Sequence, residues 1–141
     1  MATYDDLQPF ELGFPGPLRD MLVAAVLSGA KTSTTGLLQW YETAGEPLPA
    51  AGGRFAMVDS DERAVAVLEI TDVRVLRLAD VDLRHALDEG EGYTSVAEWR
   101  ASHEGFWHSA PLREELGDPE FTVDDDTPVV AERFRIVARL D

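Results

Sequence analysis

The sequence contains no cysteine among its 141 residues. This absence excludes disulfide bonds, zinc sites built on thiolates and a cysteine nucleophile. Long apolar runs are also missing, because none reaches the roughly 18 residues that a membrane-spanning helix needs. The N-terminus carries Asp5 and Asp6 where a secretory signal would carry positive charge. We therefore expect a protein that stays in the cytoplasm and has no membrane partner.

Basic residues are scarce. The chain has 12 Lys and Arg against 27 Asp and Glu, which gives a net charge of −15. Long nucleic acid is bound mainly through neutralisation of its phosphates, and so negative a field opposes that binding. Long duplexes are therefore excluded as partners. Any role with nucleic acid requires a local basic pocket and a short or single-stranded ligand.

Lysine is scarcer still. All the basic residues except Lys31 are arginine. A lysine ammonium is compact and titratable, and catalytic chemistry is one reason for a chain to keep one. The other reading is a stray lysine on the surface, and composition is compatible with both.

The rest of the composition is typical of a folded domain, with 45% hydrophobic and 28% charged residues. The length fits one domain over residues 1–141. Within it, residues 1–15 are expected to form a loosely ordered arm. Apolar residues at helical spacing predict a helix that begins at Pro17 and stops at Gly29, and a second short helix is predicted over residues 37–41.

Strands dominate the middle and the end of the chain. Residues 54–59 and 64–71 flank a polar turn and are predicted to form a hairpin. Residues 128–140 alternate apolar side chains with arginines, which is typical of a strand with one buried face. Helical segments are expected at residues 80–87, 95–108 and 111–116. This order indicates an α+β fold, in which a mixed, partly closed β-barrel carries flanking helices.

The segment from Lys31 to Gly36 is the first candidate site. It follows a predicted helix stop and offers an ammonium, four hydroxyls and the free backbone N–H groups of the next helix start. Its threonines are Thr32, Thr34 and Thr35. Such a concentration of donors suits an anion or the polar edge of a base. The alternative is a hydroxyl-rich helix cap beside a solvated lysine.

The segment around Glu91 is the second candidate. Glycines on both sides of Glu91 free its backbone and let another group approach closely. Glu89 and Glu91 would serve as a general base or bind a divalent cation, although no cofactor and no metal ligand set is assigned. The alternative is an acidic helix end, but acidic residues there oppose the helix dipole. This local penalty favours a functional interpretation.

A predicted helix that starts at Ser95 carries an aromatic stripe, and its first residues match a capping box. Trp99 is assigned to the core. Arg100 and His103 lie beside the aromatics and are candidates for the polar edge of a stacked base, or else for a purely structural role.

Glu132 shares the parity of Phe134 and Ile136 in the last predicted strand, so its side chain should point inward. A buried carboxylate needs a partner. Arg133 has the wrong parity, and the partner is therefore expected elsewhere in the site.

Four segments in chain order carry a family resemblance: Gly29-x-Lys31-Thr32-x-Thr34, Glu89-Gly90-Glu91-Gly92, Ser95-x-x-x-Trp99-Arg100-x-x-His103 and Val129-Val130-x-Glu132-Arg133-Phe134. Together they resemble the ASCH domain family, whose fold is a PUA-like β-barrel. The resemblance runs from about Phe14 to the C-terminus. The family is similar to RNA-binding PUA domains, and its members include ribonucleases and acetylcytidine amidohydrolases.

The resemblance implies roles for individual residues. In the amidohydrolases a lysine, a threonine and a glutamate form the catalytic set, which would fall here on Lys31, Thr34 and Glu91. The residues expected to bind substrate are Thr32, Thr35, Glu89, Arg100, His103 and Glu132.

The sequence thus predicts a hydrolase that acts on an acetylated nucleoside or cleaves short single-stranded RNA. In amide hydrolysis Thr34 would supply the nucleophile or position a water, Lys31 would take a proton or stabilise the oxyanion, and Glu91 would hold the lysine or shuttle the proton. The Lys31→Ala variant is expected to lose turnover without unfolding. One alternative is a non-catalytic module that binds RNA or a nucleoside in the same cleft. Another is a protein-interaction domain that uses the acidic loop 118–127.

Overall fold

Five strands form one mixed sheet in the computed structural model, which describes residues 6–140. The order across the sheet is β1-β3-β4-β5-β2, with β1 parallel to β3 and the remaining neighbours antiparallel. The strands are β1 (Gln8–Phe10), β2 (Ser33–Leu37), β3 (Arg54–Val58), β4 (Ala64–Arg77) and β5 (Pro128–Arg139).

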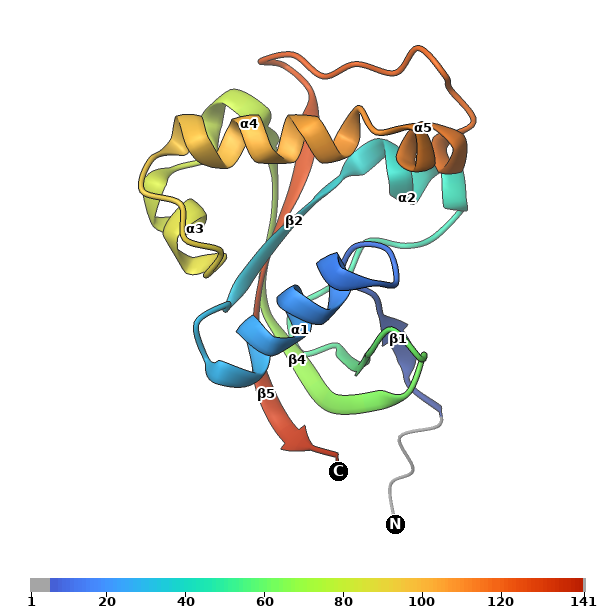
Figure 1. The fold of residues 1–141 in the computed structure, drawn as a ribbon, viewed down its shortest axis with the longest axis vertical. Coiled ribbons are helices and arrows are strands. Elements are labelled where there is room, and N and C mark those ends of the chain that lie inside the picture. The colour runs from blue at the N-terminus through green and yellow to red at the C-terminus, as the bar shows by residue number, and fades with distance from the viewer. Residues whose placement is uncertain (1–5, 141) are drawn as a thin grey trace.

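Helices cover the two ends of this sheet. They are α1 (Pro17–Ser28), α2 (Leu38–Ala44), α3 (Leu83–Asp88), α4 (Val96–Trp107) and α5 (Ala110–Leu116), and the 3-10 turn η2 (Leu78–Asp80) follows β4. In the view of Figure 1, α4 lies across the top of the long strands, α5 continues to its right beside α2, and α1 lies over the lower half of the strands. None of the helices in the described part of the chain has the length and apolar character needed to cross a membrane.

The long β4–β5 ladder connects two apolar clusters. At one end, Met57 and Leu68 pack in a cluster with residues of α1. At the other end, Trp99 and Val129 belong to a cluster built with residues of α3, α4 and α5. Burial of these side chains is the main favourable term for folding, because removal of apolar surface from water is favourable. The two clusters leave the middle of the ladder available for a polar site.

The α+β class is confirmed, whereas the expected partly closed barrel is not found in the described residues. The strands β1 and β2 form the two edges of the sheet and do not pair with each other. Residues of both edges line a common cavity, which separates them. The sheet therefore stays open.

The expectation of a loosely ordered arm is wrong for residues 8–12; residues 1–5 lie outside the described residues. Gln8–Phe10 forms β1, and Leu12 is buried. The Phe10 ring makes edge contacts with the rings of Phe55 and Phe134, at centroid distances of 5.9 and 5.6 Å. Aromatic contacts of this kind anchor the segment to the sheet.

The threonine-rich segment is also different from the prediction. The residues Ser33–Leu37 form β2, which pairs with β5. Backbone groups of this segment therefore take part in strand pairing, and they are not the free N–H groups of a helix start. Threonine is β-branched and favours a strand, and here that tendency prevails. Other local predictions are confirmed: the β3–β4 hairpin forms, Gly29 ends α1, and the Ser95 hydroxyl accepts the Glu98 N–H at the start of α4.

Candidate functional site

Lys31 lies where the chain leaves α1 and enters β2. Gly29 has a left-handed backbone, with a φ of 87°, and its N–H donates to the carbonyl of Val26. The Lys31 N–H donates to the Ala25 carbonyl at 3.1 Å, so the residue stays tied to the helix. Lys31 is only 2% exposed. The reading of this residue as a stray surface lysine is therefore wrong.

The α3–α4 loop crosses the chain beside Lys31 at Gly90. The φ of Gly90 is 67°, in the left-handed region that favours glycine. A Cβ at this position would lie 2.3 Å from the carbonyl oxygen of Ala30. Glycine is required at this crossing because no side chain fits. The close approach expected from the glycines occurs, and it brings Glu89 and Glu91 to the lysine.

The Lys31 ammonium uses all three of its N–H groups in this site. It donates to the backbone carbonyl of Glu89 at 3.4 Å, to the Oε1 of the same residue at 3.3 Å and to Oε2 of Glu91 at 3.2 Å. The side chains of Lys31 and Glu89 are each 1% exposed, so their ion pair is sealed from solvent. The lysine and the glycine-flanked glutamate thus meet directly.

Glu89 is the centre of the buried network. Its Oε1 accepts from Lys31 and lies 3.2 Å from Nε2 of His103. Its Oε2 accepts from the Thr35 hydroxyl and from the Trp99 indole N–H, each at 2.7 Å. Burial alone would raise the pKa of Glu89, but the charge of Lys31 and the histidine contacts hold it well below the ordinary value. Both oxygens are occupied, so Glu89 positions its neighbours and has no free oxygen for a ligand.

His85 is a site residue that the sequence reasoning missed. Its Nε2 lies 2.6 Å from Oγ1 of Thr35 and 3.4 Å from Oε2 of Glu89. The Thr35 hydroxyl gives its one hydrogen to Glu89, so Nε2 of His85 must carry the hydrogen that Thr35 accepts. Nδ1 of His85 is buried without a partner among the described residues. The i, i+4 spacing of His85 and Glu89 on a predicted helix end was the available signal.

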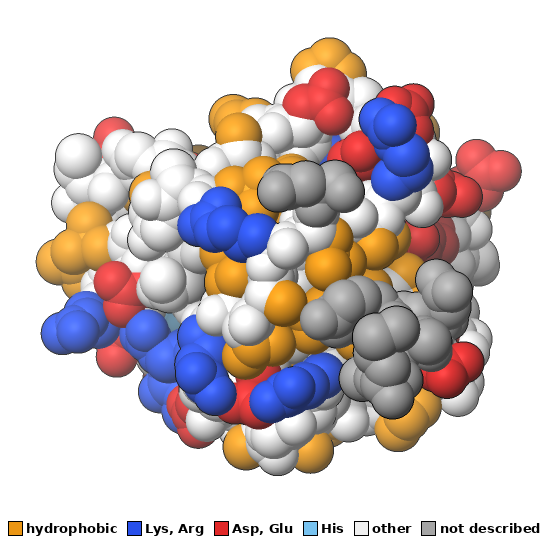
Figure 2. Space-filling view, turned by 90° about the horizontal axis from the view of Figure 1, so that it is seen from below, with side chains coloured by type: hydrophobic (Ala, Val, Ile, Leu, Met, Phe, Trp, Pro, Cys, Tyr) orange, Lys and Arg blue, Asp and Glu red, His pale blue; other side chains and the backbone are white. Residues whose placement is uncertain are grey.

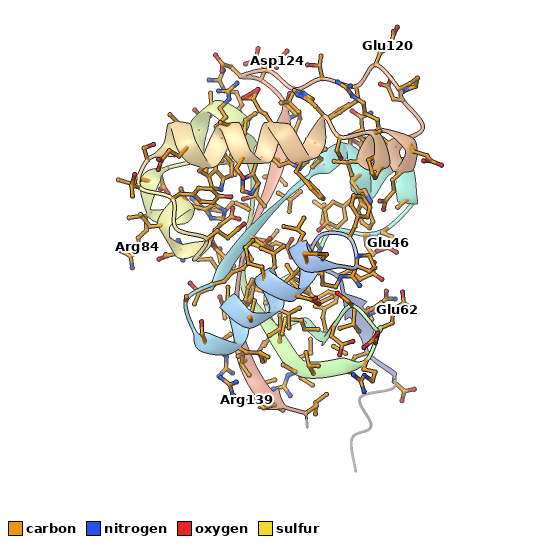
Figure 3. All side chains as sticks on the ribbon, in the orientation of Figure 1. Glu46, Glu62, Arg84, Glu120, Asp124 and Arg139 are labelled. Atoms are coloured by element: carbon orange, nitrogen blue, oxygen red, sulfur yellow. The ribbon has the colours of Figure 1, made fainter. Side chains whose placement is uncertain are left out.

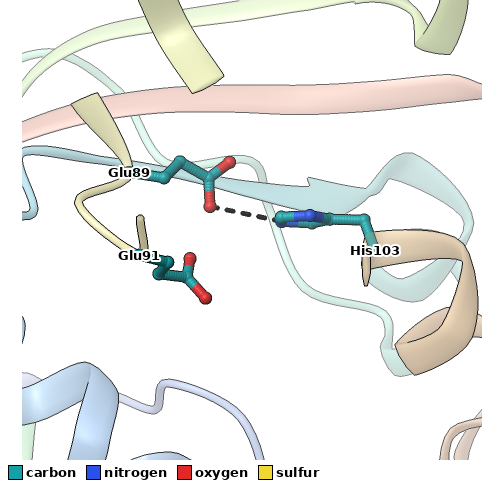
Figure 4. Close-up of side chains that lie close together, drawn as sticks. All are labelled: Glu89, Glu91 and His103. Carbon is teal, nitrogen blue, oxygen red and sulfur yellow. Dashed lines mark hydrogen bonds and ion pairs between the residues drawn. The ribbon is translucent and has the colours of Figure 1, made fainter. Parts of the chain in front are cut away.

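His103 closes the network from α4 (Figure 4). Its ring stacks on Trp99, with centroids 4.4 Å apart. Nδ1 lies 2.9 Å from the Trp99 carbonyl, and Nε2 faces the carboxylate of Glu89. Both ring nitrogens therefore face oxygen atoms, one of a backbone carbonyl and one of a carboxylate.

Glu91 has a different environment from Glu89. Its side chain is 11% exposed and lines the cavity, and its Oε1 accepts from the Tyr93 hydroxyl at 3.3 Å. Burial raises the pKa of Glu91; Lys31 acts in the opposite direction, and the negative charge of Glu89 adds to the rise. Burial also raises the pKa of Tyr93, to about 12. Of the two glutamates, Glu91 is therefore the one better suited to take up a proton.

Glu89, Glu91 and His103 could together hold a metal ion, because one ligand atom from each lies within 4.8 Å of the others. The Lys31 ammonium already lies within 3.3 Å of both carboxylates. A divalent cation would have to displace this ammonium or share the two carboxylates with it. The arrangement therefore favours lysine as the resident cation.

A cavity of about 480 Å³ opens beside this network. Thr34 and Thr35 both line it, although successive side chains of a strand point to opposite faces. Because β2 is an edge strand, the cavity lies along its unpaired edge. Aromatic side chains form much of the wall, among them Phe14, Trp40 and Phe106.

Glu132 lies directly across the ladder from Thr34. It is 4% exposed, which confirms that it points inward, and its partner is Tyr41, whose hydroxyl donates to Oε2 at 3.2 Å. Burial raises the pKa of Glu132 to about 7, although the Tyr41 hydrogen bond and the Lys31 charge act in the opposite direction. The Thr34 hydroxyl has no hydrogen-bond partner within residues 6–140, so it is available to a ligand.

Two expected ligand-binding residues do not line the cavity. Thr32 is exposed, and its backbone N–H and hydroxyl lie against the Asp88 carbonyl, at 2.8 and 3.5 Å. Arg100 binds Asp125 at 2.6 Å and Glu104 at 3.3 Å. These two carboxylates hold the guanidinium outside the cavity lining.

The acidic loop 118–127 is fastened to the body of the protein. Arg100 and Arg77 bind Asp125 and Asp126 across it. In Figure 3, Glu120 and Asp124 project outward from this loop, above α4 and α5. The cavity lining includes none of the residues of this loop.

Arginines elsewhere are also paired with carboxylates. Glu69 binds both Arg54 and Arg135. Figure 2 shows the lower face, where several blue side chains lie beside red ones. Pairs of this kind neutralise the basic groups that would otherwise attract a phosphate backbone.

The open mixed sheet, the helices at both ends and the polar cavity at a sheet edge define an α+β domain of the PUA-like type. The chain belongs to the ASCH domain family, whose sequence model matches residues 12–138. The resemblance seen in the sequence is thereby confirmed.

Solved structures share this fold. The ASCH domain from Lactobacillus crispatus JV V101 superposes with a TM-score of 0.80 at 26% identity, over 96% of this chain and 82% of that chain. A protein from Enterococcus faecalis V583 gives 0.77 at 24% identity, over 94% and 77%. An ASCH protein from Zymomonas mobilis gives 0.52 at 14% identity, over 90% and 65%. No curated protein matches the sequence.

Proposed function

We propose that this chain is a cytoplasmic hydrolase that removes the acetyl group from an acetylated nucleoside. The observation that carries the proposal is the cavity itself, which collects a buried ammonium, a carboxyl of raised pKa and a free hydroxyl from Lys31, Glu91 and Thr34. Its volume of about 480 Å³ suits a small molecule of this size. The amidohydrolases among members of the ASCH family support the same reaction type.

The reaction begins with a water held by the Thr34 hydroxyl. Glu91 takes a proton from this water while the water oxygen bonds to the acetyl carbonyl carbon. Neutral Glu91 then holds the ammonium less strongly, and one N–H of Lys31 turns to the new oxyanion. The C–N bond breaks, the amine leaves with the proton from Glu91, and the oxyanion reforms the carbonyl of acetic acid, which loses its proton to water and leaves as acetate. Lys31 acts here as a donor, because its N–H groups all face oxygens.

Glu89, Thr35 and His103 support these groups without entering the reaction. The Glu89 carboxylate fixes the ammonium from the buried side, and Thr35 and His103 hold the carboxylate. A site whose reacting groups are held in place needs little reorganisation during the reaction.

Ribonuclease activity on short single-stranded RNA is the second candidate. Lys31 and His103 both lie against Glu89, and the Lys31 ammonium together with a ring N–H of His103 would steady a pentavalent phosphate. The net charge of −15 opposes the approach of a polyanion, so the nucleoside reaction is favoured. A module that only binds these ligands is the non-catalytic alternative.

Mass-spectrometric product analysis tests the proposal. The protein is incubated with a panel of acetylated nucleosides and with short single-stranded RNAs, beside the Glu91→Gln variant as a control. We expect acetate and free amine from an acetylated nucleoside with the wild-type protein only. Cleaved RNA with intact acetyl groups would establish the ribonuclease instead, and saturable tryptophan quenching without any product would establish a binding module.

A further inference from the structure

Glu132 has a carboxyl oxygen that the proposed reaction does not use. Its Oε2 accepts from the Tyr41 hydroxyl, and its Oε1 accepts no hydrogen bond from any of the residues 6–140. The residue is only 4% exposed, and it lines the cavity. Among the described residues, His85 Nδ1 is the one fully buried side-chain polar atom without a partner, so Oε1 of Glu132 is open to the cavity. A ligand in the cavity can therefore reach this free oxygen.

The location relates Glu132 to the reacting groups. Thr34 is its direct cross-strand neighbour, so the two side chains start about 5 Å apart on one face of the ladder. Lys31 precedes Thr34 by three residues, or roughly 10 Å along an extended chain. A ligand lying along the edge of β2 would meet Glu132 and Tyr41 with one part and the Lys31–Glu91 pair with another.

We propose that Glu132 and Tyr41 form a recognition subsite for a hydrogen-bond donor directly beside an acceptor on the ligand, which is the edge that a nucleobase presents. A neutral carboxyl offers one O–H donor and one acceptor side by side, and it therefore matches such an edge with two hydrogen bonds. The Tyr41 hydroxyl fixes the orientation of the carboxyl through Oε2. This inference takes the kind of ligand, a nucleoside, from the proposed function, but it does not depend on the proposed reaction.

The protonation state decides how well the subsite matches. With its pKa raised to about 7 by burial, Glu132 is neutral in mildly acidic solution and ionised above neutrality. An ionised carboxylate has no donor left and repels the acceptor of the ligand edge. Affinity for such a ligand should therefore fall as the pH rises through about 7, approaching tenfold per pH unit.

Other ionisable groups line the same cavity and need a control. Tyr41 contacts Glu132 directly, and the charge of Lys31 acts on it from the catalytic end of the cavity. Glu46 follows α2 near Tyr41, and Glu91 and His103 lie beside Lys31 or its partner Glu89. The Arg19 guanidinium comes from α1 and is held by the carbonyls of Leu12 and Gly13. The Glu132→Gln variant leaves all these groups in place. Its amide supplies a donor and an acceptor at every pH.

The test measures binding of unacetylated nucleosides by calorimetry from pH 5.5 to 8.5. Cytidine and uridine carry a donor–acceptor edge, whereas N4,N4-dimethylcytidine and 3-methyluridine lack the donor. We expect the methylated ligands to bind at least tenfold more weakly at pH 6. We also expect wild-type affinity for the unmethylated ligands to fall with pH and that of Glu132→Gln to stay level.

A second variant gives a readout that a merely structural role would not move. The Tyr41 hydrogen bond lowers the pKa of Glu132, so Tyr41→Phe should move the midpoint of the affinity profile to higher pH. Equal affinity for methylated and unmethylated ligands, or the same pH profile in wild type and Glu132→Gln, would overturn the subsite. Acetyl hydrolysis with such a profile would leave the enzyme proposal standing. Selective, pH-dependent binding without hydrolysis would instead support the subsite and reject the enzyme.

Discussion

At the scale of single residues, the site separates two glutamates that lie two positions apart. Glu89 is surrounded by donors, and its pKa lies well below the ordinary value in spite of burial. Glu91 is partly open to the cavity, and burial together with the nearby negative charge raises its pKa. Two carboxyls with pKa values moved in opposite directions are typical of acid–base sites, where one stays charged and the other carries the proton.

The Glu91→Gln variant should lose about 10²- to 10⁴-fold in turnover, since that is the usual contribution of a general base. A base must be ionised, so wild-type activity should fall as the pH drops through the raised pKa of Glu91. The kcat–pH profile measures this fall. A variant that keeps wild-type turnover, with an unchanged melting temperature, would remove Glu91 from the reaction.

The Lys31→Ala variant should be destabilised by about 3–5 kcal/mol, because it leaves the buried Glu89 carboxylate without its cation. From the sequence alone we expect this variant to lose turnover without unfolding. The burial of the ion pair adds a cost in stability to that expectation. Urea unfolding measures the loss. The double variant Lys31→Met with Glu89→Gln removes both charges and should recover much of the stability; equal instability of the two proteins would contradict the ion-pair explanation.

Glu132 makes stability depend on pH in the opposite direction from a salt-bridged acid. Its pKa is about 7 in the folded protein against an ordinary 4.5, so ionisation above neutrality costs the folded state roughly 3 kcal/mol. The Glu132→Gln variant avoids this cost. Its melting temperature should exceed that of the wild type at pH 8 and be similar at pH 5. Thermal unfolding at both values checks this, and an identical difference at each pH would argue against a titrating Glu132.

At the scale of elements, the sequence predicted correctly the helix ends and the turn that depend on neighbouring residues. Gly29 ends α1, Ser95 caps α4, and a polar turn joins β3 to β4, as expected from capping and turn preferences. The segment after Lys31 was assigned to a helix start, but pairing with β5 makes it a strand. That pairing depends on residues about a hundred positions away, so tertiary contacts decided it.

The candidate site could be predicted only in part for the same reason. Lys31 and Glu91 stand out by rarity and by flanking glycines, and they meet in the structure. The roles of His85 and Tyr41 depend on how α3 and α2 pack against β2 and β5. Arg100 is of a residue type that suits a ligand contact, but it binds Asp125 and does not line the cavity.

Gly90→Ala should disturb the crossing of the α3–α4 loop over the chain at Ala30. The left-handed backbone alone costs about 1–2 kcal/mol for a residue with a side chain, and the Cβ would overlap a carbonyl oxygen. Turnover should fall as well, because Glu91 moves. Gly92→Ala is the matched control: its φ is 90°, but a Cβ there meets nothing within 4 Å. Equal losses of stability and turnover in both variants would show that the close approach is unimportant.

At the scale of the whole molecule, charge selects among ligands. The net charge of −15 repels polyanions at a distance, and most arginines that would offset it are paired on the surface. The cavity instead presents paired charges and aromatic walls. A small neutral molecule is therefore the ligand least affected by the field of the protein.

Binding of a neutral nucleoside should consequently change less than about twofold between 50 and 500 mM salt, since the interaction involves no release of counterions. Calorimetry at several salt concentrations measures the slope, with a short single-stranded RNA for comparison. Nucleoside affinity that falls steeply with salt would show that charge neutralisation drives binding, and would favour a phosphate-bearing ligand.

Because the only lysine is buried, its chemical reactivity reports whether the site is closed or open. Amine-directed reagents meet no ε-amino group on the folded surface, because Lys31 is 2% exposed. Reductive methylation of the native protein would thus stop at the α-amino group, and a second increment of mass would appear only in molecules whose site has opened. The kinetics of that increment would time the opening of the pocket, with no label introduced.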